Sequence, residues 1–234
     1  LPADDSWYPW IGHGEGDDLI VSYDYHLCWN YDAPGRDGLG HAPDRYDVFF
    51  MIFDTATGEW RNVQGEPLAM PITREYAEQM TFVASTGDHL DSAGHPHIGT
   101  NLGIPKTGEF LPAKSTTHYR WTGQEWVGGP GGGMPNARGD FEVSDPMTIR
   151  FLLAEQGGIV AWWNSTDGGA SFTRGQLLLE RPGAGWATSA LIRDPHPDAR
   201  VIVAEKMPGT DWARMYLLGD NGPVQRPRAE AEQR

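Results

Sequence analysis

Residues 148–172 read TIRFLLAEQGGIVAWWNSTDGGASF, and this stretch contains the pattern that decides the fold. Two short runs rich in apolar and aromatic residues, 148–153 and 158–163, are separated by an acidic and glycine-containing break. Short runs of this composition, bounded by glycine and acidic residues, are typical of β-strands. We therefore predict a β-hairpin over residues 148–163.

The second run ends in a turn sequence, Ser165-Thr166-Asp167-Gly168-Gly169-Ala170-Ser171-Phe172. An aspartate in a turn accepts hydrogen bonds from backbone N–H groups across the bend, so we assign that function to Asp167. Glycine adopts a left-handed backbone conformation without steric cost, which predicts such a conformation at Gly169. We expect the Phe172 ring to pack beneath the turn.

The same alternation of short apolar runs and turn residues recurs along the chain, which predicts an all-β fold. Glycine (30 residues) and proline (18 residues) are too frequent for a helical bundle. The best helical candidate, residues 74–80, is two turns at most. The further predicted strands are residues 19–23, 26–31, 46–53, 81–83, 97–100, 118–121, 176–179, 200–204 and 214–218.

Charge and composition exclude several classes of function. The 18 Lys and Arg residues against 32 Asp and Glu residues give a net charge of −14, which disfavours nucleic acid and anionic membranes as partners. No apolar run approaches the roughly 20 residues that span a bilayer. The single cysteine, Cys28, permits no intrachain disulfide. We expect a monomer.

The strand pairs recur every ~40 to 70 residues, which favours a β-propeller over a β-sandwich. Segments that begin with an acidic residue and lead into a strand start at Asp91, Glu155 and Asp194. At about 45 to 50 residues per blade, the chain holds roughly four or five blades, of which about four are visible, so we expect a partial propeller and a fragment of a longer protein. Residues 1–222 are assigned to blades, and residues 223–234 to a frayed tail or linker.

Several motifs resemble known propeller families. Residues 165–172 fit the Asp-box, S-x-D-x-G-x-[ST]-[WF], of the sialidase-like superfamily, with Ser165, Asp167, Gly169 and Phe172 as its structural positions. A longer resemblance is to the neuraminidase-repeat-like (BNR-4) propeller family, which includes ulvan-lyase-type polysaccharide lyases. It rests on HLCWNY at 26–31, WRNVQGEPLAMPIT at 60–73, DSAGHPHI at 91–98 and YRWTGQEW at 119–126.

The resemblance implies β-elimination beside a uronic acid, without a required cofactor. Arg or His neutralises the uronate carboxylate, and His or Tyr transfers the protons. It implies an acidic polysaccharide as partner and a secreted or periplasmic location. The family's catalytic His and its Tyr/Arg pair lie in the N-terminal half of the propeller. Tyr8-Pro9 resembles the opening of that pair, but the residue sixteen positions later is Asp24.

The remaining candidates are His and aromatic side chains on predicted strands. His26, His97 and His118 are the catalytic candidates. Each has a simpler alternative as a buried, hydrogen-bonded histidine. The candidates for substrate binding are Arg120, Trp29, Trp163 and His95. Alternation along a strand places His118 and Arg120 on one face, and the same holds for His95 and His97.

Two further functions and a structural metal stay open at this point. A sialidase-like exo-glycosidase would need three convergent arginines and a tyrosine nucleophile. A non-catalytic sugar-binding propeller would need only aromatic platforms. No catalytic metal is expected, but loop acids can hold a structural Ca²⁺ or Zn²⁺. The candidate ligands are Asp17, Asp18, Asp88, His89 and Asp91, with solvated loop acids as the alternative.

Overall fold

The computed structural model describes residues 3–29, 42–83, 88–90, 96–103, 114–129 and 131–224. These residues form four separate sheets, each of four antiparallel strands. Within every sheet the strands lie side by side in chain order, so each strand pairs with the one that follows it. The predicted all-β class is confirmed. The sheets are called the first to the fourth sheet in chain order.

Most predicted runs lie within strands, but residues 81–83 form only an isolated bridge between Phe49 and Phe82, and the strands at residues 3–13, 138–145 and 185–196 were not predicted. The first sheet contains β1 (Ala3–His13), β2 (Asp18–Trp29), β3 (Ala42–Asp54) and β4 (Trp60–Arg61). The second contains β5 (Asp88–Leu90), β6 (Pro96–Gly103), β7 (Lys114–Trp121) and β8 (Trp126–Gly129). The third contains β9 (Arg138–Asp145), β10 (Thr148–Glu155), β11 (Ile159–Ser165) and β12 (Thr173–Glu180). The fourth contains β13 (Gly185–His196), β14 (Ala199–Lys206), β15 (Ala213–Gly219) and β16 (Gly222–Pro223).

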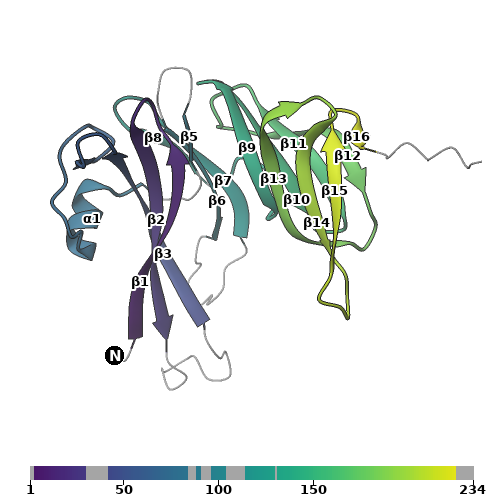
Figure 1. Cartoon of the computed structure of the whole chain (residues 1–234), viewed down its shortest axis with the longest axis horizontal. Helices are drawn as coiled ribbons and strands as arrows, with labels where there is room; N and C mark the ends of the chain where they lie inside the picture. The colour runs from purple at the N-terminus through teal and green to yellow at the C-terminus, as the bar shows by residue number, and fades with distance from the viewer. Residues whose placement is uncertain are drawn as a thin grey trace, which may run out of the picture.

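The sheets follow one another in space as they do in the chain (Figure 1). Their first strands are neighbours, because β1 contacts β5, β5 contacts β9, and β9 contacts β13. Two hydrogen bonds fix the last of these contacts. Leu191 N donates to Asp140 Oδ2 over 2.9 Å, and Ser189 Oγ donates to the Arg138 carbonyl over 3.0 Å. The strand that opens each sheet therefore touches the opening strand of the next.

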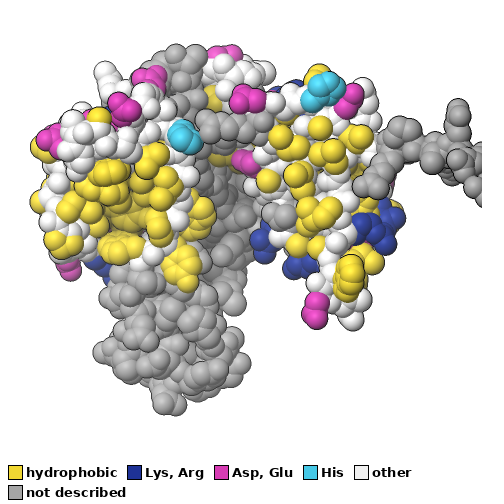
Figure 2. All heavy atoms as spheres, in the orientation of Figure 1, with side chains coloured by type: hydrophobic (Ala, Val, Ile, Leu, Met, Phe, Trp, Pro, Cys, Tyr) yellow, Lys and Arg dark blue, Asp and Glu magenta, His cyan; other side chains and the backbone are white. Residues whose placement is uncertain are grey.

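Charged side chains are distributed unevenly over the face shown in Figure 2. Most of the Asp and Glu side chains visible on this face lie along its upper edge, whereas Lys and Arg side chains gather at the lower end of the third and fourth sheets. A strongly acidic protein can thus still present a local concentration of cations.

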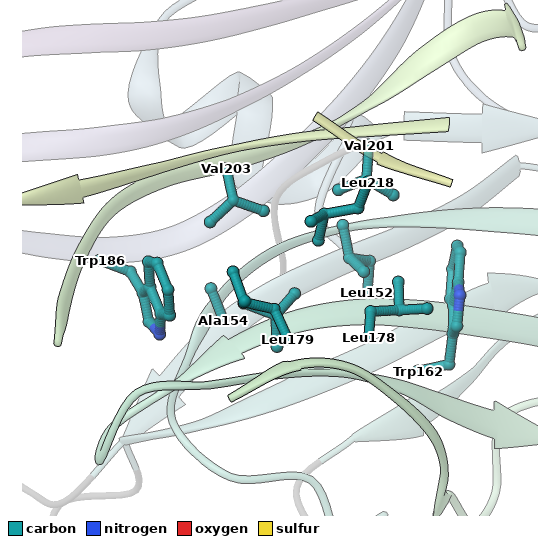
Figure 3. Packing of buried hydrophobic residues seen from close by; sticks show 10 residues of the cluster. Leu152, Ala154, Trp162, Leu178, Leu179, Trp186, Val201, Val203 and Leu218 are labelled. Atoms are coloured by element: carbon teal, nitrogen blue, oxygen red, sulfur yellow. The ribbon is translucent and has the colours of Figure 1, made fainter. Parts of the chain in front are cut away.

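The largest described core lies between the third and fourth sheets (Figure 3). Leu152, Val160 and Leu178 from the third sheet pack against Val203 and Leu218 from the fourth, and each of the five is at most 4% exposed. Burying one such side chain contributes about 1.5 to 3 kcal/mol. This core therefore fixes the third and fourth sheets face to face.

The helix in the described ranges is α1 (Arg74–Met80), which matches the predicted two-turn segment. Thr73 caps it, since its hydroxyl accepts a hydrogen bond from Tyr76 N over 3.3 Å. The helix buries Ala77 against Tyr23 and Phe49 of the first sheet. Its seven residues are too few for a bilayer span.

Candidate functional site

The turn at residues 165–172 connects β11 to β12 and is held by its own side chains. Ser165 Oγ donates to Asp167 Oδ1 over 2.7 Å and accepts from Gly169 N over 2.9 Å. Ser171 donates to Asp167 twice, from N to Oδ1 over 3.0 Å and from Oγ to Oδ2 over 2.6 Å. The hydrogen bonds from Ser171 and Ser165 stabilise the charged carboxylate, so they lower the pKa of Asp167 to about 2.

His118 of β7 lies directly beneath this turn. Its ring is 1% exposed and makes edge contacts with Phe141, Phe151 and Phe172, at centroid distances of 6.2, 6.0 and 5.8 Å. Gly169 has a φ of +88°, and a Cβ added there would come within 2.0 Å of His118 Nδ1. The predicted left-handed glycine and the packing of Phe172 are therefore both present. The third sheet covers this face of β7 and buries His118, which fits the alternative of a buried histidine; the catalytic assignment of His118 stays a prediction.

Arg120 also faces the turn, as expected for a residue two positions beyond His118. Its Nε donates to the Gly168 carbonyl over 3.1 Å, and a Cβ added to Gly168 would lie 2.8 Å from that nitrogen. Its guanidinium thus fastens the turn of the third sheet to β7. This hydrogen bond gives Arg120 a contact within the protein, and its role in substrate binding stays a prediction.

Trp163 is engaged in a similar way. Its Nε1 donates to Glu155 Oε1 over 2.9 Å, and the Arg174 guanidinium lies over the indole, 5.5 Å from its centroid. Arg174 also forms an ion pair with Glu155, which is buried. The neighbouring Trp162 is 3% exposed, so one of the two adjacent tryptophans is core, as predicted. The Arg174 guanidinium lies over one side of the Trp163 ring, and the role of Trp163 in sugar stacking stays a prediction.

The other predicted site residues are described only as backbone or not at all. His97 is the cross-strand partner of Arg120 in the β6–β7 pair, and His26 is the partner of Ser6 in the β1–β2 pair. The side chains of His26, Trp29 and His97 lie outside the described part of the structure, and so does all of His95. Their assignments stay predictions.

The loop acids show no metal-binding cluster within the described ranges, where no three His, Cys, Asp or Glu side chains converge. Asp18 forms an ion pair with Arg61, and the Asp17 carbonyl accepts a hydrogen bond from Thr55 Oγ1 over 2.7 Å. The side chains of Asp88 and His89, and all of Asp91, lie outside the described residues. A structural Ca²⁺ or Zn²⁺ therefore stays a prediction.

The structure brings together a second polar group that the sequence did not single out. This arginine cluster consists of Arg181, Glu205, Arg214 and Tyr216, at the junction of the third and fourth sheets. Glu205 of β14 is 7% exposed. Tyr216 Oη donates to Glu205 Oε2 over 2.5 Å, Arg181 Nη2 lies 3.4 Å from Oε1, and Arg214 Nη1 lies 3.5 Å from Oε2.

Part of this cluster could have been found in the sequence. Arg214 and Tyr216 are two residues apart on a predicted strand, which places them on one face. Glu205 and Arg214 are cross-strand partners in β14 and β15. Arg181 comes from the segment after β12, so only the packing of the third sheet on the fourth brings it to Glu205.

The sequence and the all-β fold are similar to those of known polysaccharide lyases. Among curated proteins, the chain is 45% identical to "Ulvan Lyase-PL25" of Pseudoalteromonas sp. (strain PLSV), over 97% of the chain and 49% of that protein. It is 44% identical to "Ulvan lyase" of Alteromonas sp. (strain LOR), over 98% of the chain and 49% of that protein. The chain therefore has ulvan lyase homologues along nearly its entire length and spans about half of theirs.

A solved structure gives the same result. The chain is 44% identical in sequence to the solved structure of a polysaccharide lyase, "PL25-Ulvanlyase bound to -[GlcA(1-4)Rha3S]-". The two structures superpose with a TM-score of 0.83. The match covers 96% of this chain and 54% of that one. No protein-family model matches the chain. The predicted resemblance to ulvan lyases is thus confirmed, while its assignment to the BNR-4 family stays a prediction.

Proposed function

We propose that this chain forms part of a polysaccharide lyase that cleaves a uronic-acid-containing, ulvan-like polysaccharide by β-elimination. The observation that carries this proposal is 45% identity to an ulvan lyase over 97% of the chain. A homologue with the same fold has been solved with a glucuronate–sulfated rhamnose unit bound. An acidic polysaccharide is therefore the substrate class that we assign.

We propose that the four sheets are consecutive blades of a sialidase-like β-propeller. Each sheet is a four-stranded antiparallel unit in chain order, and the opening strands touch in succession, as they would around a central axis. The turn at residues 165–172 has the hydrogen bonding that an Asp-box requires, which supports the same superfamily. The protein would be secreted or periplasmic, because a polysaccharide of this kind lies outside the cytoplasm. We also propose that it acts as a monomer.

The chemistry needs a base, an acid and a group that neutralises the uronate carboxylate. The base removes the C5 proton, the C4–O bond breaks, a C4=C5 double bond forms, and the acid protonates the departing oxygen. We propose His26 and His97 as the candidates for proton transfer in this chain. Trp29 and His95 are the candidates for contact with the sugar. We place His118, Arg120 and Trp163 after these candidates because their side chains make the contacts within the protein that are described above.

The test is product formation from a glucuronate–rhamnose sulfate polysaccharide. A lyase generates an unsaturated uronate, which produces a new ultraviolet absorbance. Hydrolysis would release reducing ends without that absorbance, and binding without either product would indicate a sugar-binding unit. His26→Ala and His97→Ala should lower the rate, whereas His196→Ala should not, because His196 is an exposed residue at the end of β13. Unchanged rates in both variants would remove these histidines from the proposal.

A further inference from the structure

The arginine cluster holds more positive charge than its buried carboxylate requires. Two guanidinium groups lie 3.4 and 3.5 Å from the single carboxylate of Glu205, so the three charged groups sum to +1. The Tyr216 hydrogen bond, followed by the two arginines, lowers the pKa of Glu205, which keeps that carboxylate ionised at neutral pH. One unit of positive charge is left uncompensated within the cluster.

The guanidinium groups also retain unused hydrogen-bond donors. Each guanidinium has five N–H donors, of which Arg181 uses one in a long contact to Glu205, while Arg214 contacts Glu205 and Tyr216. Within the described part of the chain, Arg181 Nε is buried and has no hydrogen-bond acceptor. The side chains of Arg181 and Arg214 are 43% and 47% exposed, so their free edges are accessible from solvent. The exposed N–H donors of the two guanidinium groups, rather than the buried Nε, are the ones that an external oxygen ligand can reach.

An exposed aromatic ring lies two residues before Arg214 along the chain. The β14–β15 hairpin projects from the lower end of the fourth sheet, close to where Lys and Arg side chains gather in Figure 2. Trp212, two residues before Arg214, is 79% exposed, the largest exposed fraction among the large hydrophobic residues described. The backbone of Trp212 is fixed within the hairpin, since Trp212 N donates to Thr210 Oγ1 over 3.2 Å. An indole offers an apolar face with a polar edge, which suits a sugar ring.

A purely structural role for the arginine cluster would need fewer charged side chains. Glu155, the comparable carboxylate at the end of β10, is buried and pairs with Arg174 and Trp163. That group is electrically neutral and joins strands of one sheet. Glu205 already receives a hydrogen bond from Tyr216 and an ion pair from Arg181 across the sheet junction. Arg214 is therefore surplus to the packing of the two sheets.

We propose that Arg181 and Arg214, with Trp212, form a subsite for an anionic group of the polysaccharide chain, either a carboxylate or a sulfate ester. Arginine suits both because its planar fork presents two parallel donors to two oxygens. Glu205 and Tyr216 are positioning residues that hold Arg214 in place. This inference rests on the proposed function, since it names how a polyanionic substrate is held by a protein of net charge −14.

The test measures binding of a glucuronate–rhamnose sulfate oligosaccharide by titration calorimetry. We expect Arg214→Gln to raise Kd about tenfold and Trp212→Ala to raise it about threefold to tenfold, in line with the loss of one charge-assisted contact or one stacking platform. Arg74→Gln is the matched control. Arg74 is also partly exposed and paired with a glutamate, Glu78, but it lies on α1. The control should leave Kd unchanged.

A desulfated oligosaccharide separates the two anionic groups. If the variants weaken only the sulfated ligand, the bound group is the sulfate ester; if they weaken both ligands equally, it is the carboxylate. Equal Kd values for Arg214→Gln and the unaltered protein would overturn the subsite, as would an equal loss in Arg74→Gln. Arg214→Gln is the deciding variant because Arg181 and Tyr216 still hold Glu205, and a thermal unfolding curve checks its fold.

Product absorbance distinguishes this inference from the proposed function. Unsaturated product together with unchanged binding in the variants would reject the subsite and retain the lyase. Binding that depends on Arg214, without any unsaturated product, would retain the subsite and reject lyase activity of this chain. Absence of any binding by the unaltered protein would reject the subsite.

Discussion

The junction between β7 and the 165–172 turn differs from the arginine cluster in how far its side chains are exposed to solvent. At the first, His118 is buried among three phenylalanine rings and Arg120 is bonded to the Gly168 carbonyl. At the second, two half-exposed arginines share one carboxylate and retain free donors. The residue types are similar at the two places, so residue type does not separate an internal contact from a binding surface.

The physical difference is which neighbour covers the strand face. The turn of the third sheet closes over His118 and Arg120, so the His118 ring is buried and Arg120 is bonded to the Gly168 carbonyl. The arginine cluster lies at the end of a sheet junction, where packing buries Glu205 and leaves the guanidinium edges open. The following predictions test this contrast, from the largest expected effect to the smallest.

Gly169→Ala should produce the largest loss of stability. The new Cβ would collide with the buried His118 ring, and the left-handed backbone would add strain, so we expect unfolding free energy to fall by about 3 kcal/mol. Gly183→Ala is the control, because Gly183 has a similar φ of +80° with nothing within 4 Å of its Cβ position, and it should cost about 1 kcal/mol. Urea denaturation measures both. Equal losses would show that His118 does not pack against this turn.

His118→Ala should destabilise the protein by about 2 to 3 kcal/mol, because it leaves a cavity among Phe141, Phe151 and Phe172. Binding of the oligosaccharide by the folded protein should not change. Urea denaturation measures the unfolding free energy, and titration calorimetry measures binding of the oligosaccharide. A variant with normal stability and abolished product formation would instead support the catalytic assignment of His118.

The stabilisation that the charged Asp167 carboxylate gives to the 165–172 turn should be lost in acid. The folded-state pKa of Asp167, about 2, is below its value of about 4 in the unfolded chain, so the charged carboxylate stabilises the fold above pH 4. That contribution is lost as pH falls from about 4 to 2. Asp167→Asn should cost about 1 to 2 kcal/mol at neutral pH and progressively less below pH 4. A constant difference between the two proteins across this range would contradict the shifted pKa.

Arg174→Gln and Arg214→Gln sharpen the contrast between the two buried carboxylates. Removing Arg174 takes the paired cation from Glu155 and should cost about 1 kcal/mol, without an effect on oligosaccharide binding. Removing Arg214 leaves Arg181 and Tyr216 on Glu205 and should cost less than about 0.5 kcal/mol, while binding weakens. The reverse pattern would indicate that the arginine cluster is structural and that Glu155 belongs to a binding site.

Much of the fold was predictable because strand signals are local. Runs such as 148–153 and 158–163 became β10 and β11, and the helical segment at 74–80 became α1. The turn chemistry of Asp167, Gly169 and Phe172 was also predictable, since its partners lie within a few residues. Alternation correctly placed His118 and Arg120 on one face.

The site was less predictable because it depends on contacts between sheets. The amino-acid sequence by itself determined an all-β chain, its strand order, the internal bonding of one turn and a likeness to polysaccharide lyases. Only the tertiary structure decided that the turn covers His118 and that Arg181 reaches Glu205, 24 residues away in sequence. Alternation along a strand determines which side chains share a face, but the packing of the neighbouring sheet determines whether that face meets protein or solvent.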